Sequence, residues 1–97
     1  MKTTIEYLQI LKEYKALKAV QYGIVSIGIF GSVARGEQTA DSDVDVYVDM
    51  TSPNLFNLVH IKDELQQLFG CPVDIVRLRQ NMDSLLQHSI MEDGVYA

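Results

Sequence analysis

The feature that most constrains the fold is a strict alternation of valine with polar or aromatic residues between Asp43 and Asp49. Successive side chains of a β-strand point to opposite faces, so this period of two predicts a strand with one buried face. The buried face is expected to carry Val44, Val46 and Val48. The opposite face is expected to carry Asp43, Asp45 and Tyr47. The rest of the chain must therefore supply a sheet around a strand with one carboxylate-bearing face.

Two further strands are predicted from runs rich in β-branched residues, at 24–30 and at 72–78. Between the first strand and the alternating segment, Gly31 to Gly36 forms a glycine-bounded turn with room for one short helical turn. The first two strands are close in sequence and are expected to be antiparallel. The second and third are separated by a helical crossover and are expected to be parallel.

Three helices are predicted around these strands. Apolar residues at helical spacing indicate an N-terminal helix over about residues 3–19, with its apolar positions at Ile5, Leu8, Leu11 and Tyr14. A middle helix is expected to run from an N-cap at Ser52, with Pro53 at its first position, to Gly70. Its inward positions are expected to be Leu55, Leu58, Ile61, Leu65 and Leu68. A last helix is expected over about residues 83–92, with Asp83 as its cap. The fold class is α+β, one small mixed sheet with helices packed on it, in a single domain spanning 1–97.

The composition argues against several classes of protein. The chain has 13 acidic and 8 basic residues and a net charge of −5, which disfavours a domain that mainly grips RNA or DNA phosphates. The longest uncharged stretch, Ala19 to Ala34, is shorter than the roughly 20 apolar residues of a membrane span. A single cysteine, Cys71, excludes an internal disulfide and is typical of a reducing compartment. We therefore expect a cytoplasmic protein without a membrane partner.

The expected topology brings several polar groups to one edge of the sheet. The end of the first strand, at Gly31 and Ser32, should lie beside the start of the second, at Asp43, and Asp74 should lie level with Asp43 and Asp45. Residues two apart on a strand share a face at about 7 Å. Clustered carboxylates repel one another, and oxygen ligands of this kind suit Mg²⁺. A pair of such ions promotes phosphoryl or nucleotidyl transfer.

These residues, Gly31 to Gly36, Ser42 to Val46 and Val73 to Val76, resemble the polymerase-β-like nucleotidyltransferase superfamily. More closely, the chain resembles its minimal nucleotidyltransferases, the MntA-type antitoxins of HEPN/MNT toxin–antitoxin pairs. The resemblance implies that two Mg²⁺ ions are bound by three carboxylates, Asp43, Asp45 and Asp74. It also implies that the nucleotide is bound by Gly31, Ser32, Arg35 and Ser42.

The resemblance further implies Mg²⁺-dependent transfer of AMP from ATP to an acceptor hydroxyl, most directly a tyrosine of a HEPN-type helical partner. A chain this short leaves little sequence for an acceptor pocket, which favours a macromolecular partner. Two alternatives stay open. One is a non-catalytic antitoxin that neutralises a HEPN partner by contact. The other is transfer to a small molecule or an RNA end, with a homo-oligomer completing the pocket. His60, His88 and Cys71 are interpreted as structural residues rather than ligands or nucleophiles.

Overall fold

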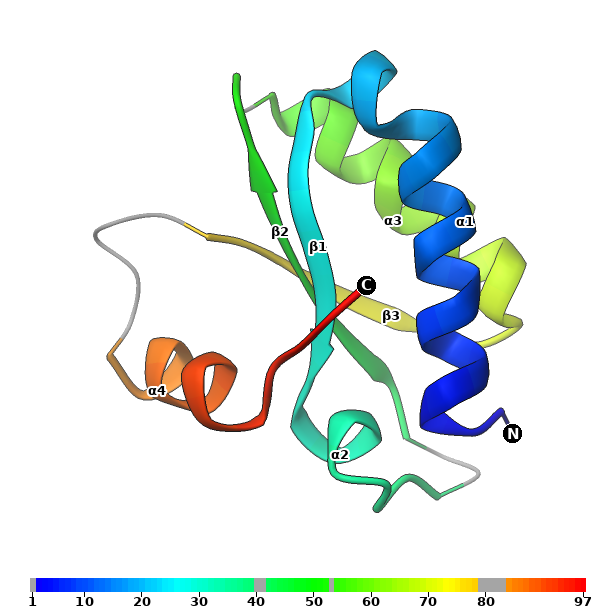
Figure 1. The fold of residues 1–97 in the computed structure, drawn as a ribbon, viewed down its shortest axis with the longest axis vertical. Helices are drawn as coiled ribbons and strands as arrows, with labels where there is room; N and C mark the ends of the chain where they lie inside the picture. Colours follow the sequence, from blue (N-terminus) through cyan, green and yellow to red (C-terminus); the bar gives the residue numbers. More distant parts are fainter. Residues whose placement is uncertain (1, 40–41, 53, 79–83) are drawn as a thin grey trace.

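The computed structural model describes residues 2–39, 42–52, 54–78 and 84–97. Four helices and four strands follow one another in these described ranges (Figure 1), in the order α1 (Thr4–Tyr22), β1 (Ile24–Phe30), α2 (Gly31–Ala34), β2 (Val44–Met50), α3 (Leu55–Phe69), β3 (Val73–Arg77), α4 (Ser84–Asp93) and β4 (Val95–Tyr96). The strands form one mixed sheet in the order β3-β2-β1-β4. The α+β class predicted from the sequence is confirmed. None of the described helices is both long and apolar enough to cross a membrane.

The strand directions agree with the prediction. β1 pairs with β2 in antiparallel register, and β2 pairs with β3 in parallel register across the α3 crossover. β4 was not predicted from the sequence. It pairs antiparallel with β1, where Tyr96 lies opposite Gly28. Two residues are too few to show a strand period, so this pairing depends on contacts that the local sequence does not reveal.

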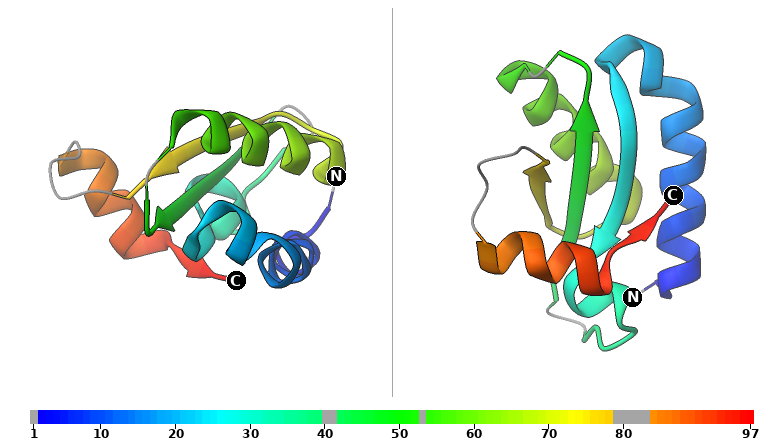
Figure 2. Two further views of the ribbon diagram at one scale, coloured as in Figure 1. Left: turned by 90° about the horizontal axis from the view of Figure 1, so that it is seen from above. Right: turned by 60° about the vertical axis from the view of Figure 1, so that its left-hand side comes forward.

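The two faces of the sheet are covered differently. α1 and α3 pack on one face, and α4 crosses the other (Figure 2). The face under α1 and α3 holds the main core, whose fully buried members include Leu11, Ile27, Ile29, Val44, Val46, Val48, Ile61 and Leu65. Under α4 lies a smaller apolar cluster of Phe30, Tyr47 and Ile90. The valines of the alternating strand therefore face the main core, as predicted.

Helix ends differ from the prediction where several capping residues compete. Thr3 caps α1 in a capping box with Glu6, and the helix continues three residues beyond its predicted end, to Tyr22. The predicted cap of α3 at Ser52 is wrong. Asn54 is the N-cap, because its side chain accepts hydrogen bonds from the backbone N–H groups of Phe56 (2.8 Å) and Asn57 (3.3 Å). The predicted positions Pro53 and Asp83 lie outside the described residues.

Three residues predicted to point inward are exposed instead. Ile5 and Leu55 lie largely in solvent, and Leu68 is half exposed. The buried stripes run along other positions, Tyr7, Leu11, Tyr14 and Tyr22 on α1 and Ile61, Leu65 and Phe69 on α3. A helix buries one stripe, and residues that lie outside it stay in contact with water however apolar they are.

Candidate active site

The register of the sheet places two carboxylates side by side. Asp45 of β2 pairs with Phe30, the last residue of β1, and on its other side with Asp74 of β3. Paired residues share a face of a sheet, so both aspartates belong to the face opposite α1 and α3. Asp45 is half-buried, whereas Asp43 and Asp74 are exposed. The juxtaposition of Asp45, Asp74 and the end of β1 predicted from the sequence is confirmed.

The turn that follows β1 lies directly against Asp45. Gly31 begins α2 with φ of +73°, a left-handed conformation that favours glycine. A Cβ atom at Gly31 would collide with Oδ2 of Asp45. Glycine is therefore needed both for the backbone conformation and for the close approach of the carboxylate. Ser32 follows at once in α2 and is half-buried.

Electrostatics link the three carboxylates. Burial raises the pKa of Asp45, and the neighbouring charges of Asp74 and Asp43 raise it further. The guanidinium of Arg35 acts in the opposite direction on that pKa, while its Nε lies 3.3 Å from the Glu37 carboxylate. Negative charge is thus concentrated at this edge more than one arginine offsets, so a bound cation would relieve the repulsion.

The donor set suits Mg²⁺ in its chemistry. In the described part of the chain, no three His, Cys, Asp or Glu side chains are close enough to hold one ion together. Mg²⁺ does not require such a cage, because it is usually bound by one or two carboxylates together with phosphate oxygens and water. Asp45 with an adjacent aspartate fits that mode. The assignment of Asp43, Asp45 and Asp74 as metal ligands stays a prediction.

Ser42 has a local structural role. Its Oγ accepts a hydrogen bond from the backbone N–H of Thr39 (2.9 Å), and its own N–H donates to the Thr39 carbonyl (3.0 Å). These bonds join Ser42 to Thr39 just before Asp43. The part of Ser42 in nucleotide binding also stays a prediction.

The residues that hold the turn after β1 in place were not predicted from the sequence. Thr4 at the start of α1 donates to the carbonyl of Val33 in α2, and the Gln38 amide donates to the carbonyl of Lys2 (3.2 Å). The N-terminus of α1 therefore positions the segment that carries Gly31 and Ser32. No sequence motif signals these bonds, since each joins positions far apart in the chain.

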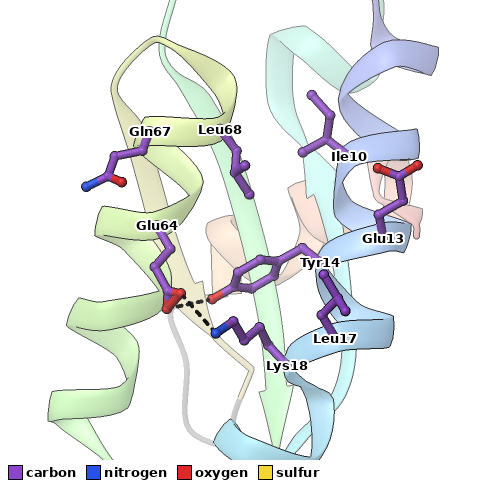
Figure 3. A pocket seen from close by; sticks show the side chains of 8 residues that line it. All are labelled: Ile10, Glu13, Tyr14, Leu17, Lys18, Glu64, Gln67 and Leu68. Carbon is purple, nitrogen blue, oxygen red and sulfur yellow. Dashed lines mark hydrogen bonds and ion pairs between the residues drawn. The ribbon is translucent and has the colours of Figure 1, made fainter.

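The residues interpreted as structural have structural partners. His60 stacks on Tyr22, with ring centroids 6.5 Å apart, and His88 lies 3.3 Å from Glu92 on α4. Cys71 Sγ contacts the Tyr7 hydroxyl at 3.7 Å. A groove between α1 and α3 (Figure 3) contains none of the predicted site residues.

The chain is similar in sequence to known proteins. The family model described as "Polymerase beta, Nucleotidyltransferase" matches residues 6–96. A Methanocaldococcus jannaschii protein named "Putative protein adenylyltransferase MJ1217" is 36% identical over 97 residues, covering 99% of both chains. "Protein adenylyltransferase MntA" of Thermococcus cleftensis is 34% identical over 97 residues, covering 99% of this chain and 97% of its own.

Solved structures show the same fold. One described as a "putative minimal nucleotidyltransferase" superposes with a TM-score of 0.77 at 30% identity, over 97% of this chain and 95% of its own. Another, of a tri-AMPylated Shewanella oneidensis HEPN toxin in complex with MNT antitoxin, gives 0.61 at 22% identity, over 91% and 70% of the two chains. At that identity the second match supports the fold alone.

Proposed function

The chain belongs to the polymerase beta nucleotidyltransferase family, and from that membership we propose that it transfers AMP from ATP to a tyrosine hydroxyl of a HEPN-type toxin. It is a nucleotidyltransferase of the minimal type, and relatives across its whole length are named protein adenylyltransferases. A HEPN toxin carrying AMP accompanies the antitoxin of the same fold. Adenylylation would make this chain the antitoxin of such a pair.

The observation that carries the proposal is the sheet register, which pairs Asp45 with Asp74 on one side and sets Asp45 beside the turn at Gly31 on the other. In the transfer, the acceptor oxygen forms a bond to the α-phosphorus while the bond from that phosphorus to the pyrophosphate oxygen breaks. Asp74, exposed beside Asp45, would take the proton of the hydroxyl. Most of the rate enhancement in such reactions comes from positioning and charge neutralisation.

The remaining residues of the site have roles in binding the triphosphate. Gly31 has no side chain to block a phosphate, the Ser32 hydroxyl can donate a hydrogen bond, and Arg35 supplies positive charge. Two Mg²⁺ ions, each held by one or two of the carboxylates of Asp43, Asp45 and Asp74, would neutralise the phosphate oxygens and fix their orientation. ATP and Mg²⁺ are abundant in the cytoplasm, where we place the reaction.

The experiment mixes the chain with a HEPN-type protein, ATP and Mg²⁺ and weighs the partner by intact mass spectrometry. We expect increments of one or more AMP units, lost when EDTA is added. The triple variant Asp43→Ala, Asp45→Ala, Asp74→Ala should add none. Asp49→Ala is the matched control, since Asp49 is a half-buried aspartate further along β2 and should leave transfer intact.

The outcomes separate the rival functions. If wild type and triple variant neutralise the toxin equally and no AMP is added, the chain acts by contact. If AMP is added to RNA or to a small alcohol but never to protein, the enzyme class holds and the acceptor is wrong.

The nucleotide roles are tested by calorimetry of ATP binding. Ser32→Ala should weaken ATP binding in the presence of Mg²⁺ while leaving affinity for the partner unchanged. Loss of partner affinity with unchanged ATP affinity would assign Ser32 to the acceptor side.

A further inference from the structure

A second surface, remote from the carboxylate edge, has the features of a protein-binding site. It is the groove between α1 and α3 on the outer side of the helix layer, with a volume of about 600 Å³ (Figure 3). We call it the α1–α3 groove, and its lining residues are Ile10, Glu13, Tyr14, Leu17, Lys18, Glu64, Gln67 and Leu68. Volumes of this size are typical of sites that take ligand groups or side chains.

The groove is held open by a polar contact between the two helices. The Glu64 carboxylate on α3 accepts hydrogen bonds from the hydroxyls of Tyr14 (3.4 Å) and Tyr22 (2.5 Å) on α1. Lys18 adds an ion pair to the same carboxylate at 3.9 Å. These contacts fix the spacing of α1 and α3, so the groove exists before any partner arrives. A preformed site loses less conformational entropy on binding.

Apolar side chains of the groove lie in water. Leu17 is 79% exposed and Leu68 is 50% exposed. One turn beyond Leu17, Val20 is 97% exposed, which extends the apolar strip along α1. Contiguous exposed apolar groups rimmed by polar ones are typical of protein interaction sites.

The charges around the groove favour a basic occupant. On α1, Glu6 and Glu13 lie on one stripe with Ile10 and Leu17, at spacings of three and four residues. Of the described charged residues that line the groove, Glu13 and Glu64 are acidic, and the one basic residue, Lys18, is already paired with Glu64. The excess of carboxylates would repel a second copy of this surface, which argues against self-association through it.

We propose that the α1–α3 groove binds an amphipathic helix of a partner protein whose apolar stripe is flanked by lysine or arginine. The apolar stripe would cover Leu17 and Leu68, and the basic flanks would meet Glu13 and its neighbours, as in helix-in-groove recognition. α1 and α3 cover the face of the sheet opposite the carboxylate edge. Docking in the groove therefore leaves the carboxylate edge free, and it does not depend on the transfer reaction.

The test uses a designed peptide of about 18 residues, five helical turns, built from leucine on one stripe and lysine elsewhere. Its counterpart replaces every lysine with glutamate. Titration into the full chain should give binding of the lysine peptide that weakens with added salt, and no binding of the glutamate peptide. Amide shifts in NMR spectra should gather on the residues that line the groove.

Two variants with the same change of charge sharpen the test. Leu17→Lys should weaken binding of the lysine peptide by about tenfold or more, because it removes apolar contact and adds repulsion. Met91→Lys, at an exposed residue of α4, should bind it as the wild type does. ATP affinity should be the same in both variants and the wild type, which separates this inference from the proposed function.

The inference is overturned if both peptides bind alike, if Leu17→Lys binds as tightly as Met91→Lys, or if the shifts lie outside the groove. It is also overturned if the chain dimerises through the groove, shown by ultracentrifugation as a dimer that Leu17→Lys abolishes.

Discussion

The two faces of the sheet differ in what their residues do. On the face under α1 and α3, the valines of β2 are fully buried in one continuous core together with Ile27 and Ile29 of β1. On the other face, Asp45 and Asp74 are paired, and the pKa of Asp45 is raised by burial and by the neighbouring carboxylates. One face of β2 thus contributes side chains to the core, and its other face contributes side chains to the candidate active site. Substitutions on the two faces should therefore affect separate properties, stability on one and transfer activity on the other.

The largest expected effect is on the chemical face. Asp45→Asn should lower adenylyl transfer by about 10³-fold, the scale of removing a charged group that acts in the transition state. The same change should raise the melting temperature of the nucleotide-free protein, because it removes repulsion with Asp43 and Asp74. Transfer assays and thermal melts measure the two effects. A variant that lost both activity and stability would contradict the separation of the faces.

The stabilisation expected from Asp45→Asn should depend on pH in a defined direction. The pKa of Asp45 is raised in the folded protein, so the folded state binds its proton more tightly than the unfolded state does. Stability of the wild type therefore falls as pH rises through that pKa. The stabilisation by Asp45→Asn should be largest at neutral pH and shrink as the solution is acidified toward pH ~3.8.

On the core face, Leu65→Ala should lower the free energy of unfolding by about 2–5 kcal/mol, since Leu65 is fully buried. ATP affinity should be unchanged at temperatures where the variant is folded. Leu55→Ala on the same helix is the matched control, because Leu55 is 74% exposed, and it should change stability by less than about 0.5 kcal/mol. Denaturant titration with calorimetry tests both, and equal losses in the two variants would refute the observed burial.

The role of the turn that follows β1 can be tested by substituting the glycines at its two ends. Gly31 and Gly36 both have positive φ, so alanine at either should cost about 1–2 kcal/mol of backbone strain. A Cβ at Gly31 meets the Asp45 carboxylate, whereas one at Gly36 meets nothing within 4 Å. Gly31→Ala should therefore also weaken ATP binding, and Gly36→Ala should not. Matching ATP affinities in the two variants would show that the contact with Asp45 is unimportant.

The smallest expected effect concerns the start of α3. Asn54→Ala should destabilise the protein by about 1 kcal/mol, because it removes the hydrogen bonds to the N–H groups of Phe56 and Asn57. Ser52→Ala should have little effect on the free energy of unfolding. If urea titrations showed a larger loss of unfolding free energy for Ser52→Ala than for Asn54→Ala, Ser52 would be the N-cap.

Sequence patterns predicted the parts of the fold that depend on local periodicity. The alternation at 43–49 and the β-branched run at 24–30 gave the correct strands, and short versus helical connections gave their directions. The meeting of Asp45 with Asp74 followed from those directions, because antiparallel and parallel pairing determine which strand ends share an edge.

What the sequence could not predict depends on contacts between distant segments. Leu55 and Leu68 fit an apolar stripe as well as Leu65 does, and only the packing against the sheet selects among them. The same holds for β4 and for the Thr4 and Gln38 bonds that position the turn. The α1–α3 groove was missed for this reason, since it needs both helices in place.

The pairing of Asp45 with Asp74 has a consequence for the order of assembly. The connection between β1 and β2 is shorter than the one between β2 and β3, so it should close at lower entropic cost and bring Gly31 beside Asp45 first. Asp74 can join them only after α3 has packed and β3 has paired in parallel, a non-local step that is slower. A chain arrested with only β1 and β2 paired would have Asp43 and Asp45 in place without Asp74. Only completely folded molecules would then be catalytically active, so partly folded molecules could not consume ATP.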